Sequence, residues 1–110
     1  MLLSVIRMKK NNNKVAIVTG AGSGIGKAVA LGLAKEGLDV YLAGRKKKKL
    51  LITKQQSIKE NNIGSCHVIK CDVSEEIDVR KLFLLIQKQY GRLDLLFNNA
   101  GIGIEANTID

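Results

Sequence analysis

Short apolar runs alternate along the chain with longer segments in which apolar residues recur at helical spacing. Runs this short, bounded by turn residues, are typical of buried strands, and they cover residues 15–18, 39–44, 66–71 and 93–97. The periodic segments between them cover residues 25–36, 47–61 and 74–90. The pattern therefore predicts four strands and three helices in strict alternation.

Each predicted helix carries an apolar stripe that marks the face expected to lie on a sheet. The first stripe consists of Ile25, Val29 and Leu33, and the third of Val79, Leu82, Phe83, Ile86 and Tyr90. The second helix is weaker, and Leu51, Lys54 or Gln55, and Ile58 hold the helical spacing there. The second helix is the most polar, so we expect it to be well exposed. Ser74 precedes the third helix as its expected N-cap, and two glutamates follow it where the helix dipole favours acids.

A helix between two buried strands forms a crossover that joins parallel strands and is right-handed. Three crossovers in succession predict a doubly wound, parallel α/β sheet with the strand order 3-2-1-4. The third strand is less apolar than the others, which suits an edge. In such sheets ligands bind at the carboxyl ends of the strands where the winding reverses, here between the first and fourth strands.

A glycine-rich turn, Thr19–Gly26, connects the first strand to the first helix. Glycines let the backbone turn tightly and let a phosphate approach main-chain N–H groups without meeting a Cβ atom. The unpaired amides at the start of the following helix supply donors and a partial positive charge. We expect the phosphate-binding residues to be Gly20, Gly22, Ser23, Gly24, Ile25 and Gly26. The alternative is a loop that only turns the chain.

Composition narrows the class of protein. The chain has 110 residues, 45% hydrophobic and 25% charged, which suits one globular domain. No apolar stretch approaches the roughly 20 residues that span a membrane. The opening apolar residues are too short for a signal-peptide core and precede the charges, so we expect a cytoplasmic protein. Residues 1–13 lack periodicity and are expected to form a flexible leader, with residues 14–110 as the domain.

The charge and the cysteines add little chemistry of their own. The net charge is +8, and five consecutive basic residues occupy 45–49. Nucleic-acid binding is disfavoured because no aromatic residues accompany this run, so a solvated surface is the simpler interpretation. Cys66 and Cys71 are five residues apart, so they point to opposite faces of a strand, and His67 is the sole histidine. We expect two reduced cysteines and no metal site.

Four segments at predicted strand ends resemble the short-chain dehydrogenase/reductase family in order and spacing. They are the glycine turn at Thr19–Gly26, Ala43-Gly44-Arg45, Cys71-Asp72-Val73 and Asn98-Asn99-Ala100-Gly101. The resemblance covers the chain from about Lys14 to Gly101 and implies a Rossmann-type fold. It also implies hydride transfer between a nicotinamide cofactor and an alcohol or carbonyl substrate.

The resemblance implies a role for several residues. Asp72 and Val73 would lie beside the adenine, and Asn99, Ala100 and Gly101 would line the ribose and nicotinamide. Asp72 could instead only end its strand before a capping serine, and the asparagines could only tie the fourth strand to its neighbours.

The end of the second strand favours NADP(H) as the cofactor. NAD sites usually carry a carboxylate there, but this chain has Gly44, and the strand's one acid, Asp39, lies at its other end. Arg45 follows, and a guanidinium suits the 2′-phosphate of NADP. The lysines at 46–49 either add a positive field that favours this phosphate or form only the solvated start of a helix. NAD(H) remains an alternative cofactor.

The chain contains none of the family's catalytic residues. The family uses a Tyr with a Lys four residues later, but here Arg45 follows Tyr41 and Asp94 follows Tyr90. We therefore expect the cofactor-binding, amino-terminal part of an oxidoreductase, incomplete at its carboxyl end and able to self-associate through the open edge of the fourth strand. A non-catalytic dinucleotide-binding module or partner subunit is the alternative.

Overall fold

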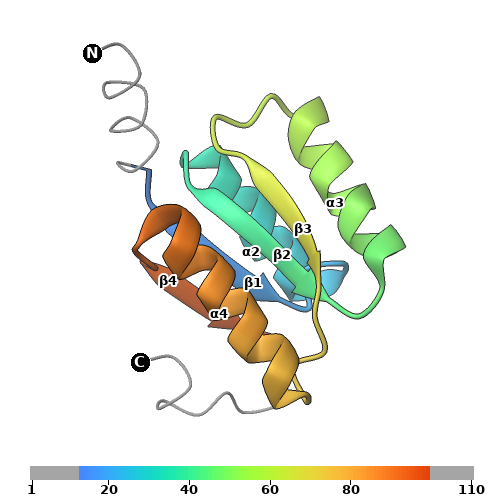
Figure 1. Cartoon of the computed structure of the whole chain (residues 1–110). Coiled ribbons are helices and arrows are strands. Elements are labelled where there is room, and N and C mark those ends of the chain that lie inside the picture. The colour runs from blue at the N-terminus through green and yellow to red at the C-terminus, as the bar shows by residue number, and fades with distance from the viewer. Residues whose placement is uncertain (1–12, 100–110) are drawn as a thin grey trace, which may run out of the picture.

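The computed structural model describes residues 13–99, in which strands and helices alternate as the sequence predicts (Figure 1). The elements are β1 (Val15–Thr19), α2 (Gly24–Lys35), β2 (Asp39–Gly44), α3 (Lys47–Lys59), β3 (Cys66–Lys70), α4 (Glu76–Tyr90) and β4 (Leu95–Asn98). Within these residues no helix is long and apolar enough to cross a membrane.

The strands form one parallel sheet in the order β3-β2-β1-β4, which confirms the predicted topology and places β3 at an edge. β1 pairs with β2 on one side and with β4 on the other, so the winding reverses between β1 and β4. Helices α2 and α3 cover one face of the sheet and α4 covers the other (Figure 1). The carboxyl ends of all four strands therefore meet at one edge of the sheet.

Alternation along the strands builds a separate core on each face of the sheet. Val18, Val40 and Leu42 pack with the helices on the α2–α3 face, whereas Ile17 and Tyr41 pack under α4. Cys66 belongs to the first core and Cys71 to the second, and both are free thiols, as predicted.

Two predicted helix faces are wrong by one position. Ile25 in α2 is 67% exposed and Ile58 in α3 is 66% exposed, although each was expected to face the sheet. The buried residues are instead Gly26, Ala30 and Ala34 in α2, and Leu50, Thr53 and Ser57 in α3. In α2, small residues on the inner face bring the helix close to the sheet, so packing distance rather than side-chain hydrophobicity selects the buried stripe. The inner face of α3 instead buries Leu50, and Thr53 beside it donates a hydrogen bond to the carbonyl of Ala21.

The apolar stripe of α4 is confirmed, because Val79, Leu82 and Ile86 are buried in the core beneath it. Its predicted cap is wrong. Glu75 occupies the N-cap position, and the hydroxyl of Ser74 instead donates to Asp72 at 2.6 Å.

Strand β4 begins two residues later than predicted. The N–H of Asp94 donates to the carbonyl of Val15 at 2.9 Å, and the N–H of Val15 donates back to the Asp94 carboxylate at 2.8 Å. This reciprocal pair joins the two strands just before β4 begins. Arg92 holds the same carboxylate with two hydrogen bonds and lowers the pKa of Asp94.

Candidate functional site

The residues predicted from four separate segments converge on the carboxyl edge of the sheet. Thr19 at the end of β1 lies opposite Ala43 in β2 and Asn98 in β4. The glycine turn leaves β1 at this edge and enters α2 (Figure 1). Ala100 and Gly101, which were also predicted to bind the cofactor, lie outside the described residues.

The glycine turn adopts a backbone that side chains disfavour. Gly20 has φ +64° and Gly24 has φ +57°, both in the left-handed region. The N–H of Gly20 donates to the carbonyl of Ala43 at 2.9 Å, which fixes the start of the turn on β2. Ser23 is the N-cap of α2 and makes no side-chain capping bond, so the first amides of the helix have no serine oxygen competing for them.

The glycines of the turn serve different purposes. A Cβ atom on Gly26 would overlap the carbonyl oxygen of Gly20 and lie 2.9 Å from Nδ2 of Asn99. A Cβ on Gly22 would lie 2.7 Å from Cβ of Lys49 in α3. A Cβ on Gly24 would meet no atom within 4 Å. Gly22 and Gly26 are thus required by packing, whereas Gly24 borders open space where an anion can approach.

Thr19 joins the glycine turn to the end of β4. Its hydroxyl donates to Oδ1 of Asn98 at 3.0 Å and accepts from the N–H of Asn99 at 2.9 Å. Asn99 therefore lies beside Gly20 and Gly26, and its contact with the cofactor stays a prediction. Thr19 is not among the predicted site residues. A hydroxyl at the end of a buried strand, directly before the glycines, is nevertheless a sequence feature that could have indicated this contact.

The predicted adenine and 2′-phosphate residues occupy the neighbouring strand ends. The N–H of Cys71 donates to the carbonyl of Gly44 at 2.8 Å, which aligns the exits of β2 and β3. The side chain and N–H of Ser74 donate to Asp72 and lower the pKa of its carboxyl, and the nearby positive charge of Arg45 lowers it further. Asp72 thus remains ionised and accepts hydrogen bonds within the turn after β3, although the serine that it holds does not cap α4.

The positive charge next to this edge is concentrated at the start of α3. Lys46 is the N-cap, and the first turn contains no acidic residue. Lysines here lie near the positive end of the helix dipole, which is electrostatically unfavourable for the helix and favourable for an arriving anion. Arg45 and the lysines at 46–49 are exposed.

The thiol of Cys71, just after β3, is not an activated nucleophile. Burial, together with the charges of Asp78 and Asp72, raises the pKa of Cys71 to about 11, so its thiol stays protonated at neutral pH. No group of three potential metal-ligating side chains occurs within residues 13–99.

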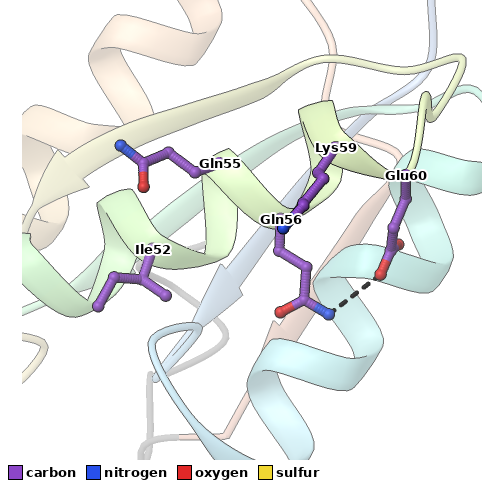
Figure 2. Close-up of a pocket in the computed structure, with 5 residues that line it drawn as sticks. All are labelled: Ile52, Gln55, Gln56, Lys59 and Glu60. Atoms are coloured by element: carbon purple, nitrogen blue, oxygen red, sulfur yellow. Dashed lines mark hydrogen bonds between the residues drawn. The ribbon is translucent and has the colours of Figure 1, made fainter.

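A shallow depression on α3 lies apart from the site. Ile52, Gln55, Gln56, Lys59 and Glu60 line it (Figure 2). All five belong to α3 or its end, and Gln56 donates to Glu60 at 3.0 Å. The lining residues do not include any residue of the glycine turn, so we assign no role in cofactor binding to this depression.

Comparison with known proteins agrees with this geometry. Residues 14–110 match the family described as short chain dehydrogenase. A human protein named dehydrogenase/reductase SDR family member 1 is 42% identical over 95 residues, covering 86% of this chain and 30% of its own length.

Two solved structures show the same fold with a cofactor bound. A metagenomic short-chain oxidoreductase in complex with NADP has a TM-score of 0.75 and 34% identity, over 82% of this chain and 40% of that one. Actinorhodin polyketide ketoreductase with NADPH has a TM-score of 0.74 and 35% identity, over 84% of this chain and 34% of that one. The chain thus spans less than half of the length of these relatives. From its glycine turn to the end of β4 it belongs to the short-chain dehydrogenase/reductase family.

Proposed function

We propose that this chain is the NADP(H)-binding, amino-terminal part of a short-chain oxidoreductase. The single observation that carries the proposal is the glycine turn, in which Gly24 borders open space at the start of α2 while Gly20 and Gly26 close against Asn99. The pyrophosphate would lie against the amides of this turn. When bound, the cofactor supplies hydride chemistry, and in the whole protein that hydride would pass to or from an alcohol or carbonyl substrate.

The other residues of the proposed site lie on either side of the turn. Asp72 and Val73 would contact the adenine, and Asn99, with Ala100 and Gly101, would line the ribose and nicotinamide. We propose residues 14–110 as the cofactor-binding domain, preceded by a leader at 1–13. We propose the cytoplasm as the compartment because two free cysteines stay reduced there.

The proposed preference for NADP(H) rests on Arg45. It is exposed immediately after β2, the end of that strand carries no carboxylate of its own for the ribose hydroxyls of NAD, and the lysines at 46–49 add positive charge. The two related structures contain NADP and NADPH, which supports the same choice. Asp72 offsets part of the positive field of Arg45, so NAD(H) remains the alternative.

We expect the chain to bind NADPH at least about tenfold more tightly than NADH, since a charge-assisted contact contributes roughly 1.5–3 kcal/mol. Calorimetric titration of each cofactor measures the ratio. Arg45→Ala should reduce the ratio to near unity. Lys59→Ala, which removes an exposed cation from the other end of α3, is the matched control and should leave the ratio unchanged. Equal affinities for the two cofactors, or a preference that survives Arg45→Ala, would contradict the assignment.

We further propose that the 110-residue chain self-associates through β4. Among the described strands, β4 pairs with β1 alone, and Leu95 on β4 is 40% exposed. An unpaired strand edge next to apolar side chains is a template for pairing with another chain. We expect light scattering to show dimers or larger species, and Leu95→Lys to reduce them. A monodisperse monomer that melts cooperatively would contradict the proposal.

A further inference from the structure

Helix α3 contacts the glycine turn directly, although α2 and β2 separate the two in the sequence. Cβ of Lys49 lies where a side chain on Gly22 would be, and Leu50 packs beneath Gly44. Leu50 and Ala21 also share one core cluster. The first turns of α3 therefore pack against the glycine turn.

A single buried hydrogen bond fixes this contact. The hydroxyl of Thr53 donates to the carbonyl of Ala21 at 2.9 Å, and both residues are fully buried. The same hydroxyl lies 3.4 Å from the carbonyl of Lys49 in its own helix, a longer and weaker alternative acceptor. A hydroxyl has one proton to donate, so the shorter bond to the turn is the favoured one.

The carbonyl of Ala21 sits at the centre of the turn. The N–H of Gly20 is held by Ala43 on β2, and the next residues, Gly22 to Gly24, become increasingly exposed toward the proposed pyrophosphate. The orientation of one peptide plane sets the direction of the amide that follows, because the peptide unit is rigid. Fixing the Ala21 carbonyl toward α3 therefore directs the N–H of Gly22, which points the opposite way in the same peptide unit, away from α3.

We propose that Thr53 is a positioning residue for dinucleotide binding, one that holds the glycine turn in its phosphate-binding conformation through the Ala21 carbonyl. This inference rests on the proposed function. It assigns to α3 a role in pyrophosphate affinity that is separate from the charge at its first turn. Thr53 itself does not contact the cofactor.

The test compares two ligands and four proteins. Thr53→Val replaces the hydroxyl by a methyl group of similar size, and Thr53→Ser keeps the donor. Ser57→Ala is the matched control, because Ser57 is also buried on α3 but accepts from Asn62 at 3.0 Å, away from the turn. NADPH probes the whole site. Adenosine 2′-monophosphate, titrated by NMR, probes the adenosine and 2′-phosphate side without a pyrophosphate.

We expect Thr53→Val to bind NADPH about tenfold more weakly, equivalent to about 1.4 kcal/mol, while its affinity for adenosine 2′-monophosphate stays unchanged. Thr53→Ser and Ser57→Ala should bind both ligands as the unaltered chain does. Thr53→Val binding NADPH normally, or losing both ligands equally, would overturn the proposal.

Two further outcomes separate the proposals. If Thr53→Val does not fold, Thr53→Ala provides the same comparison without a branched side chain. If neither variant folds, the role of Thr53 is purely structural and the positioning role is overturned. If the unaltered chain binds adenosine 2′-monophosphate but not NADPH, the turn is no pyrophosphate site, and both the proposed function and this inference are wrong. If it binds NADPH and Thr53→Val matches it, only this inference is wrong.

Discussion

Gly26→Val is expected to abolish NADPH binding. Any Cβ at this position would overlap the carbonyl oxygen of Gly20 and press on the side chain of Asn99, so α2 could not start where it does. Overpacking of this kind costs roughly 1–3 kcal/mol or more, and the displaced helix amides no longer face the phosphate. Gly20→Val acts differently, by placing a branched side chain at φ +64°. For both variants we expect the affinity to fall by roughly 100-fold or more.

Calorimetry on each variant, with circular dichroism to monitor folding, measures the effect. Gly32→Ala is the matched control, since Gly32 lies in the same helix and a Cβ there would meet no atom within 4 Å. That control should bind NADPH normally and gain about 0.5–1 kcal/mol in free energy of unfolding. Normal binding by both valine variants would mean that the turn does not hold the phosphate.

The second large effect is an absence of turnover when the 110-residue chain is assayed alone. Reduction of a carbonyl needs a proton donor at the substrate oxygen while the hydride moves, and positioned proton transfer is worth about 10²–10⁴ in rate. Tyr41 is 4% exposed in the core beneath α4, and its hydroxyl donates to Gln89. Tyr90 packs edge-on against it at the last turn of α4, and burial raises the pKa of both tyrosines.

His67 does not replace a catalytic tyrosine. It is the second residue of β3, stacked on Tyr41 with ring centroids 4.8 Å apart, and burial lowers its pKa, so it is neutral near pH 7. We expect no NADPH oxidation with a panel of aldehydes, ketones and quinones. Reproducible turnover that disappears in Gly24→Val would contradict this expectation. Such turnover would favour catalytic residues supplied by a second chain. Binding of NADPH without turnover also fits the alternative of a non-catalytic dinucleotide-binding module.

The fold was predictable because its signals are local and repeated. Each strand is a short apolar run, each helix has a periodic stripe, and glycines mark the ends, so the order of elements and the parallel topology follow from general rules. The convergence of Thr19–Gly26, Arg45, Asp72 and Asn99 on one edge follows from that topology. No rule beyond strand order is needed to bring these segments together.

The roles of individual side chains were less predictable, because they depend on how closely the elements pack and on which groups each side chain can reach in the folded chain. The exposed face of α2 carries Ile25 while Gly26 and Ala30 face the sheet, because close packing favours the smaller residues. Thr53 was not identified, since nothing in its neighbourhood in the sequence indicates that its hydroxyl reaches Ala21. Ser74 resembles a helix cap in sequence but binds Asp72 instead, because two local acceptors compete for one hydroxyl.

Hydrogen–deuterium exchange of the chain with and without NADPH shows which segments the bound cofactor protects, and it tolerates self-association. We expect slower exchange in peptides covering 19–26, with weaker protection at 43–45, 71–73 and 98–101. Gly26→Val should show none of this protection at the same NADPH concentration. Protection that is absent from 19–26, or that persists unchanged in Gly26→Val, would mean that the glycine turn does not bind the cofactor.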